Sequence, residues 1–372
     1  MKKTIRVINI VLFIAIIFMS ALLVFRVITL KKEQSNANVK EQSEVATEEQ
    51  IDSTTEGSTD CYVEEPSDTD PNKFTFNPHV VPQKLYDAYG EAEWTAFFNM
   101  VDAIRKGEDT FECSSREVYE WCFSGGVTNN LYPPCVGALE RNFVDGYDEE
   151  RRVGTLTYLI PKEELIKREQ EFEAQIMDVV NTYVKKDNTD FEKCLILYNY
   201  MVNNYTYDYN EFDIIKRDES NNYERGTFCT YRTFVDKCGV CEDLSSLYNY
   251  LLLQCGVEAY QFNSGSLDHA WSYVIVGGQG YHVDPTWAIC DYDGNITLQY
   301  FLMPEYVRAY DCPKGDIYPP LYYYDYHNNV EFPADDNSYE PLRNGNFVNM
   351  DTERKVVQYS NVDGVFEFQY FN

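Results

Sequence analysis

The chain has 372 residues, of which 61 are acidic and 31 are basic, so its formal net charge is −30. This length suits two domains, or one domain with elaborations. No basic patch or stripe occurs along the chain, which argues against a nucleic-acid partner, and the strong acidity favours a solvated surface that repels polyanions.

The first 32 residues predict a membrane anchor. Basic residues precede an apolar run from Val7 to Phe25, which is long enough to cross the hydrocarbon core of a bilayer. A cleaved secretory signal is the alternative, but the run is long for such a signal and no Ala-x-Ala cleavage site is evident. We therefore expect residues 1–32 to form an uncleaved transmembrane helix, with the rest of the chain extracytoplasmic.

Two segments of contrasting composition follow. Residues 33–72 are rich in Glu, Ser, Thr, Asp and Asn, so they cannot bury a core and predict a disordered stalk. Residues 73–165 predict an α+β pre-domain, because apolar residues from Leu85 to Ile104 recur with helical spacing and residues 153–160 have the composition of a strand. The sequence assigns no chemistry to this pre-domain, which could cover a substrate cleft or pack against the core.

A predicted core begins with two helices, over residues 163–185 and from Phe191 to Val202. An acidic loop from Tyr205 to about Gly226 follows. Its carboxylates could bind calcium, but it lacks the spacing of an EF-hand loop, so we expect a solvated loop.

The most informative stretch runs from Cys238 to Trp287. After Cys241, apolar residues recur at helical spacing until Gly256, which suits the left-handed position at the end of a helix. Cys241 is therefore expected at a helix N-terminus, where the helix dipole and free N–H groups favour a thiolate. The alternative is a small buried residue that seals the start of the helix.

A β-hairpin is expected next. Residues 269–276 have the composition of a strand, Gly277-Gly278 is a two-residue turn signal, and residues 279–284 return as the partner strand. This register places Trp271 opposite Asp284 and His269 diagonal to Asp284, roughly 7–8 Å away at Cα and within side-chain reach. A three-residue loop would place Asp284 on the opposite face.

Cys241, His269 and Asp284 are the residue types that thiol catalysis requires. A thiolate attacks a carbonyl carbon, a histidine takes the thiol proton and returns a proton to the leaving amine, and a carboxylate orients the imidazole. The Cys241 backbone N–H, at the start of its helix, is a natural oxyanion donor. The sequence does not assign a second donor.

Three short motifs in this stretch, Gly239-Val-Cys241, His269-Ala-Trp271 and Asp284-Pro-Thr-Trp287, resemble those of the transglutaminase-like superfamily of papain-fold enzymes, in its bacterial extracytoplasmic form. The resemblance covers roughly residues 170–310. It implies that Cys241 is the nucleophile, His269 the base and Asp284 the orienting acid. The family includes cross-linking enzymes, peptidases, deglycosylating enzymes and inactive members, so it implies a reaction type rather than a substrate.

Cys238-x-x-Cys241 also permits two other interpretations. A thiol–disulfide oxidoreductase places such a motif at a helix start, but it would leave His269 and Asp284 without a role. A zinc site would need two more ligands at suitable spacing, and the sequence has no second CxxC motif. His282 shares a strand face with Asp284, but it lacks the His-Ala-Trp context and is expected to serve in hairpin packing.

After Trp287, we expect a turn from Cys290, a strand over residues 300–303 and a Tyr-rich extension over residues 313–372 that ends in a β-hairpin around Asn361-Val-Asp-Gly364. The chain has 11 cysteines. In an exported domain some of them should form disulfides, and the odd number fits one free nucleophile.

Together these features predict an α+β, papain-like core over residues 166–312, in which the Cys241 helix packs on an antiparallel sheet bearing His269 and Asp284. The predicted function is a membrane-anchored thiol enzyme that acts on peptide or protein amides in the cell envelope, as a peptidase, amidase or acyltransferase. No cofactor or metal is expected. The alternative is a surface binding module that has kept the fold and lost turnover.

Overall fold

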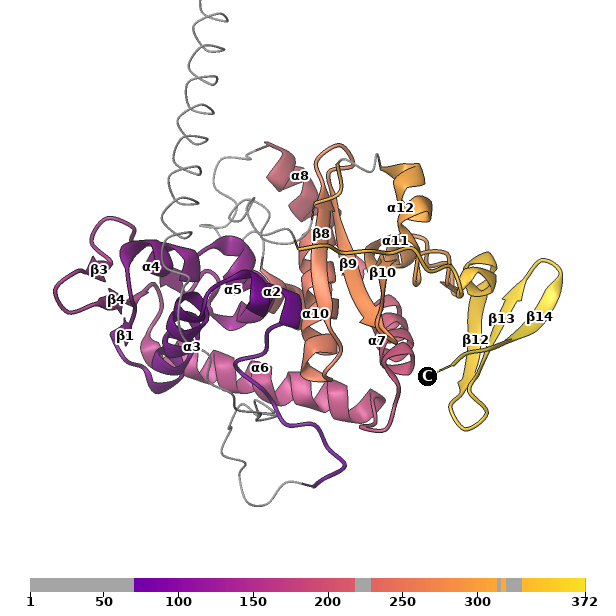
Figure 1. The fold of residues 1–372 in the computed structure, drawn as a ribbon, viewed down its shortest axis with the longest axis horizontal. Helices are drawn as coiled ribbons and strands as arrows, with labels where there is room; N and C mark the ends of the chain where they lie inside the picture. Colours follow the sequence, from indigo (N-terminus) through magenta and orange to yellow (C-terminus); the bar gives the residue numbers. More distant parts are fainter. Residues whose placement is uncertain (1–69, 218–228, 313–315, 319–329, 372) are drawn as a thin grey trace, which may run out of the picture. The chain divides into compact units, whose positions relative to one another are not determined.

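The computed structural model describes residues 70–217, 229–312, 316–318 and 330–371 (Figure 1). The chain divides into two units, Met1–Glu65 and Pro66–Asn372, and every described residue lies in the second. The predicted anchor and nearly all of the predicted stalk lie outside the described residues. Within the described ranges, no helix combines the length and the apolar character needed to cross a membrane.

The pre-domain is a mixed α+β segment. Its predicted helix is interrupted at Gly90, which adopts an extended conformation before the second helix, and its predicted strand is divided into two short strands. Trp94 and Trp121 pack edge to face at its centre, with ring centroids 5.0 Å apart. Its elements are α2 (Gln83–Ala88), α3 (Glu91–Lys106), β1 (Thr110–Glu112), α4 (Arg116–Cys122), α5 (Gly125–Leu131), a 3-10 turn η1 (Pro133–Cys135), β2 (Leu139–Glu140), β3 (Tyr147–Asp148), β4 (Val153–Thr155) and β5 (Thr157–Tyr158).

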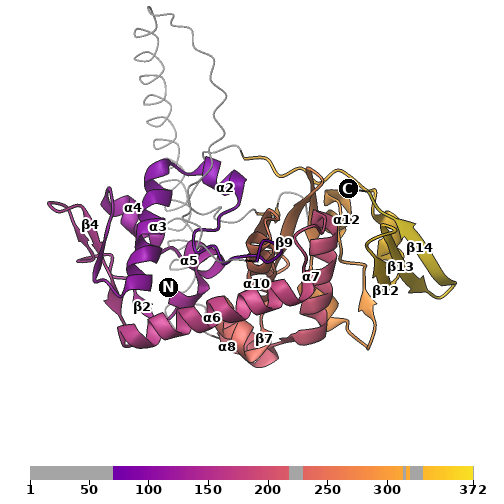
Figure 2. The ribbon, with the colours of Figure 1, turned by 90° about the horizontal axis from the view of Figure 1, so that it is seen from below.

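Two long helices follow, as the apolar spacing predicts. Helix α6 (Lys162–Tyr183) lies beside both the pre-domain and the later helix α10 (Cys241–Gln254) (Figure 2). Helix α7 (Asp190–Asn204) begins with a capping box between Thr189 and Glu192. The next elements are β6 (Thr206–Tyr207), α8 (Tyr209–Arg217), α9 (Thr230–Asp236) and β7 (Cys238–Gly239).

Helix α10 packs against a three-stranded antiparallel sheet with the strand order β10-β9-β8 (Figure 1). The strands are β8 (Ala259–Ser264), β9 (His269–Val276) and β10 (Gln279–Val283). Val276 pairs with Gln279 across the two-glycine turn, so the predicted hairpin register is confirmed. Helix α10 also ends as predicted, since Gly256 takes a φ of 76° directly after the C-cap residue Cys255. The predicted α+β core, a cysteine helix on an antiparallel sheet, is therefore present.

The strand predicted over residues 300–303 is wrong. Only Met303 joins the sheet, by two backbone hydrogen bonds with His282 of 2.8 and 2.7 Å. Leu302 has a φ of 49°, which breaks the extended backbone just before that bridge. The apolar side chains that suggested a strand are buried without forming one.

The C-terminal part contains α11 (Pro285–Cys290), α12 (Glu305–Asp311), a 3-10 turn η3 (Glu340–Asn344) and a four-stranded sheet with the order β11-β12-β13-β14. The strands are β11 (Ile296–Thr297), β12 (Asn346–Asp351), β13 (Val356–Asn361) and β14 (Gly364–Gln369). The last two strands pair through Asn361 and Gly364, which confirms the predicted terminal hairpin.

The predicted disulfides do not occur among the described cysteines, all ten of which are free thiols. Several of these thiols instead donate hydrogen bonds to oxygen atoms within their own surroundings. Cys135 donates to the Tyr132 carbonyl at 3.2 Å, and Cys312 donates to the Ser264 hydroxyl at 3.0 Å. Buried cysteines of this kind behave as small apolar residues with a weak donor.

Candidate active site

Cys241 is the first residue of helix α10, as the sequence predicts. The preceding strand β7 pairs in parallel with β6, so Gly239 lies opposite Tyr207. A Cβ on Gly239 would come within 2.2 Å of the Thr233 hydroxyl, which explains why a glycine stands two residues before the thiol. The Cys241 side chain is half-buried, and no side chain caps the N-terminus of the helix. The first N–H groups of α10 therefore have no side-chain acceptor from the cap residue.

His269 and Asp284 meet as the hairpin register predicts. His269 Nε2 lies 2.7 Å from Asp284 Oδ2, and the Asp284 side chain is fully buried. Asp284 stands one residue beyond strand β10 and caps helix α11, where its Oδ1 accepts a hydrogen bond of 3.0 Å from the Trp287 N–H. Because Nε2 serves the carboxylate, Nδ1 is the ring nitrogen left for the thiol.

The electrostatics of this pair favour an imidazolium. Burial alone would lower the pKa of His269, but the charge and hydrogen bond of Asp284, together with a hydrogen bond to Cys241, raise it to about 10. Burial would raise the pKa of Asp284, but His269 and then Arg308 bring it below its ordinary value. At neutral pH the two groups are therefore an ion pair next to the Cys241 thiol.

Two indole rings flank this ion pair. The Trp287 ring stacks on the His269 ring with centroids 5.1 Å apart and an interplanar angle of 16°. The Trp271 ring stacks on it from 6.1 Å. Trp271 belongs to the motif that carries His269, and Trp287 belongs to the motif that carries Asp284. Their packing on the His269 ring explains why a tryptophan accompanies each of the two polar residues in the sequence.

Arg308, on helix α12, is a further charged residue in the site, and sequence reasoning missed it. Its Nη1 atom lies 3.2 Å from Asp284 Oδ2, and both side chains are fully buried. The only available signal was the spacing of Glu305 and Arg308, one helical turn apart after Pro304. That pattern is also typical of a solvated helix face.

His282 serves in packing, as its sequence context suggests. Its ring is fully buried, and its Nδ1 accepts a hydrogen bond of 3.0 Å from the Trp271 indole N–H. This contact leaves the proton on Nε2, which donates to Glu305 at 2.9 Å. Burial is the largest influence on the pKa of His282 and lowers it, so the ring is neutral. His282 therefore fixes the Trp271 indole.

The surroundings of the site include other polar and aromatic groups. Cys238 lies in strand β7 and is half-buried, while Cys290 is exposed at the end of helix α11. The Tyr209 hydroxyl lies 4.0 Å from the Cys290 sulfur. In the described part of the chain, no group of three or more His, Cys, Asp or Glu residues is arranged to hold a metal ion.

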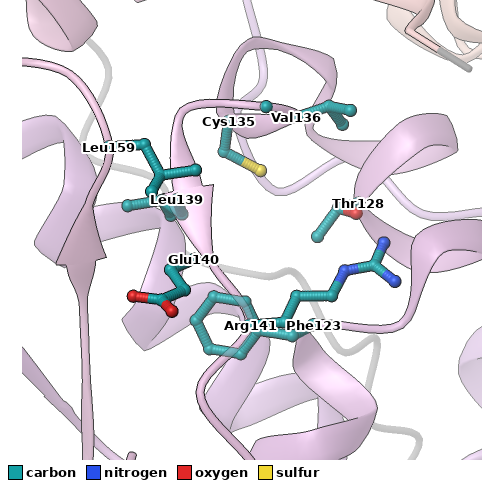
Figure 3. A pocket seen from close by; sticks show the side chains of 9 residues that line it. Phe123, Thr128, Cys135, Val136, Leu139, Glu140, Arg141 and Leu159 are labelled. Carbon is teal, nitrogen blue, oxygen red and sulfur yellow. The ribbon is translucent and has the colours of Figure 1, made fainter. Parts of the chain in front are cut away.

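A separate pocket of about 240 Å³ lies in the pre-domain (Figure 3). Its lining combines the buried Cys135 thiol with apolar side chains such as Leu139 and with the ionisable pair Glu140 and Arg141. None of the three predicted site residues belongs to its lining.

The comparison with family models places part of the chain in a known class. Residues 178–287, which include Cys241, His269 and Asp284, match the model described as the transglutaminase-like superfamily. This stretch is therefore a transglutaminase-like core, as its three motifs predict. Arg308 lies beyond the matched residues.

Three solved structures are similar to parts of the chain. A protein from Cytophaga hutchinsonii, proposed to be a cysteine protease, is 18% identical over 32% of this chain and 37% of its own, with a TM-score of 0.23. A structure described as a TGase is 19% identical over 36% of this chain and 35% of its own, with a TM-score of 0.29. A protein from Parabacteroides distasonis ATCC 8503, proposed to be a protease, is 14% identical over 38% of this chain and 30% of its own, with a TM-score of 0.22.

The chain thus spans about a third of the length of the solved structures that it matches. The comparison with curated proteins gave no match.

Proposed function

We propose that this protein is a thiol enzyme that acts on amide bonds of peptides or proteins through an acyl-thioester. The observation that carries the proposal is the buried His269–Asp284 ion pair, with 2.7 Å between Nε2 and Oδ2, beside a cysteine at a helix N-terminus. In this proposal Cys241 is the nucleophile, His269 the general base and then the general acid, and Asp284 the residue that orients the imidazole.

The reaction would proceed in two stages. The Cys241 thiolate attacks the carbonyl carbon of the amide, and the Cys241 backbone N–H stabilises the oxyanion that forms. The imidazolium of His269 gives its proton to the leaving amine, which breaks the carbon–nitrogen bond and leaves the acyl group on sulfur. Asp284 holds the imidazole ring throughout, because its carboxylate binds Nε2 while Nδ1 faces the thiol.

The second stage decides between hydrolysis and transfer. Water that attacks the thioester would make the protein a peptidase or amidase, whereas a primary amine would make it a transglutaminase-like acyltransferase. Both outcomes regenerate the thiol and use His269 in the same way. In our proposal the core acts outside the cytoplasm on cell-envelope substrates, and the apolar run within residues 1–32 anchors it.

A product assay tests the proposal. The full-length protein and its Cys241→Ala variant are incubated with a peptide library, with and without a labelled primary amine, and the products are identified by mass spectrometry. We expect the wild type to give products at a rate at least about a thousandfold above that of Cys241→Ala. Cleaved peptides would identify a hydrolase, and amine-tagged peptides would identify a transferase.

Cys290→Ala is the matched control, because it removes an exposed thiol near the site without touching the proposed triad. It should retain the wild-type product pattern. If neither the wild type nor Cys241→Ala forms products, the result would contradict the proposed enzymatic activity and favour a binding module.

A further inference from the structure

We propose that Arg308, which lies beyond the residues that match the family model, is a positioning residue for the site: it competes with His269 for one oxygen of Asp284, and so weakens the hold of that carboxylate on the imidazolium proton of His269. This inference rests on the proposed function, since it concerns the same His269–Asp284 pair. It assigns a role in the chemistry to helix α12.

His269 and Arg308, the two cations of the site, contact the same oxygen of Asp284. His269 Nε2 lies 2.7 Å from Asp284 Oδ2, and Arg308 Nη1 lies 3.2 Å from the same oxygen. The other oxygen, Oδ1, accepts the Trp287 backbone N–H. Both oxygens of Asp284 therefore accept hydrogen bonds. Oδ2, the oxygen that orients His269, is shared between His269 and the permanently charged guanidinium of Arg308.

The packing around Arg308 holds the guanidinium in this place. Its central carbon lies 4.0 Å from the centroid of the Trp271 ring and 4.3 Å from that of the Trp287 ring. The same two indoles flank the His269 ring. A guanidinium between two aromatic faces is stabilised by cation–π attraction, and its plane is fixed by them.

Stability alone does not account for an arginine here. Its side chain is fully buried, and neither Nε nor Nη2 finds a hydrogen-bond acceptor among the described residues. Burying unmatched donors costs free energy, and an apolar side chain of similar volume is often as stable or more stable at such a position. The charge of Arg308 is therefore better explained by its action on Asp284.

The expected effect on His269 follows from charge. A positive group beside Asp284 offsets part of the carboxylate field that holds the proton on the imidazole. Removing that positive group should raise the pKa of His269 above its value of about 10. A histidine that holds its proton more tightly is a weaker general acid toward the leaving amine.

The other ionisable groups that face the His269–Asp284 pair do not obscure the effect of Arg308 on the pKa of His269. Burial raises the pKa of Tyr198 on α7, of Tyr300 before α12 and of Tyr207 on β6. Cys290 on α11 is exposed as a residue, but partial desolvation of its sulfur and the nearby Asp284 raise the pKa of its thiol. On β10, His282 is neutral and hydrogen-bonds Glu305 of α12. On α10, Cys241 hydrogen-bonds His269 directly, and no substitution of Arg308 replaces either residue.

A histidine titration tests the proposal without any substrate. The chain has 4 histidines, so NMR spectra of the full-length protein labelled in its imidazole rings can resolve them, with the His269 signal assigned by its loss in His269→Gln. The titration is recorded between about pH 7 and 12.5 for the wild type, Arg308→Met, Arg308→Gln and Arg308→Lys. Arg105→Met is the control, because Arg105 pairs with Glu169 in another part of the molecule.

In either neutral variant of Arg308 the midpoint of His269 should rise by about one pH unit. Arg308→Lys, which keeps the charge, should stay near the wild type, as should Arg105→Met. A wild-type midpoint in a folded Arg308→Met or Arg308→Gln protein would overturn the role of Arg308. An equal rise in Arg308→Lys would also overturn it, because the charge would then not be the cause.

Alkylation of Cys241 by iodoacetamide, measured in the same wild-type samples, separates this inference from the proposed function. A wild-type Cys241 that reacts no faster than the exposed Cys290 at neutral pH would contradict the thiol enzyme. A fast wild-type Cys241 with unchanged His269 titration in the neutral variants would contradict only the role of Arg308.

Discussion

At the scale of single residues, the site depends on the buried negative charge of Asp284, which His269 and Arg308 share. Asp284 is fully buried, yet it stays ionised because His269 and Arg308 lie on one of its oxygens and a backbone N–H on the other. The Trp271 indole, fixed from behind by His282, closes one side of this arrangement. The ionisation of Asp284 and the orientation of His269 therefore depend on these specific hydrogen bonds.

Replacing Asp284 by Asn tests the carboxylate. The variant keeps the size of the side chain but removes the charge that raises the pKa of His269, so we expect the His269 midpoint to fall from about 10 toward its ordinary value near 6.5. Turnover should fall about 10⁴-fold, because the amide can hold the imidazole in the wrong tautomer. NMR titration and the product assay measure the two effects, and an unchanged midpoint would contradict the ion pair.

The same pair predicts a pH dependence of stability. The pKa of His269 is higher in the folded protein than in the unfolded chain, so its contribution to the free energy of unfolding is complete below about pH 6.5. That contribution should be lost as the pH rises through about 10. Urea denaturation at pH 6, 8 and 10 should show a loss in the wild type that His269→Gln lacks, whereas parallel curves would contradict the prediction.

At the scale of elements, helix α10 is tied to the pre-domain through Asp243. This side chain is fully buried in the first turn of α10 and accepts a hydrogen bond of 3.2 Å from Asn129 of helix α5. Burial is the main cause that raises its pKa to about 8. The folded protein therefore keeps a proton on Asp243 that the unfolded chain has lost above about pH 4.

Replacing Asp243 by Asn should flatten the pH dependence of stability. In the wild type, Asp243 makes the free energy of unfolding fall between about pH 4 and pH 8, because the folded state binds the proton over that range. The amide has no such proton and should remove this slope. Urea midpoints at pH 5 and pH 8 for both proteins measure it, and equal slopes would show that Asp243 ionises freely in the folded state.

Gly239 fixes the approach of strand β7 to the cysteine helix. Gly239→Ala should destabilise the fold by about 1–3 kcal/mol and slow any reaction of Cys241, because the new methyl would lie 2.2 Å from the Thr233 hydroxyl. Gly265→Ala is the control, since its Cβ would meet nothing nearer than 3.9 Å. Thermal denaturation of the two variants provides the comparison, and equal melting temperatures would be incompatible with this packing.

The elements that hold the three predicted site residues could be predicted from sequence because their patterns are local. Apolar spacing after Cys241 gave the helix, and the two-glycine turn gave the strand register that brings His269 to Asp284. Arg308 could not be predicted, because nothing in its short helix indicates that the arginine faces inward. The strand expected over residues 300–303 was wrong because burial, rather than pairing, explains the apolar residues there.

At the scale of the whole described unit, Glu192 links the C-terminal sheet to helix α7. Its Oε1 accepts hydrogen bonds from Lys355 Nζ at 2.8 Å and from the Tyr370 hydroxyl at 2.6 Å. Its Oε2 accepts from Asn188 and from the Thr189 N–H. Burial opposes ionisation of Glu192, but these four donors bring its pKa below the ordinary value.

Replacing Glu192 by Gln should loosen the C-terminal strands. We expect a loss of about 2 kcal/mol, because a neutral amide cannot accept all four hydrogen bonds. Limited proteolysis should then cut between β12 and β14 before the rest of the described unit. Glu367→Gln on exposed β14 is the control and should change little, and equal proteolysis of both variants would contradict the role of Glu192.

The assignment of Cys241 as the nucleophile is tested by the rate at which iodoacetamide modifies it, resolved by mass spectrometry of the full-length protein at pH 7. We expect Cys241 to react at least about tenfold faster than the more exposed Cys290, and His269→Gln to remove the difference, because the variant has no imidazole to take the thiol proton. A Cys241 that reacts no faster than Cys290, or equally fast without His269, would contradict the assignment of Cys241 as the nucleophile.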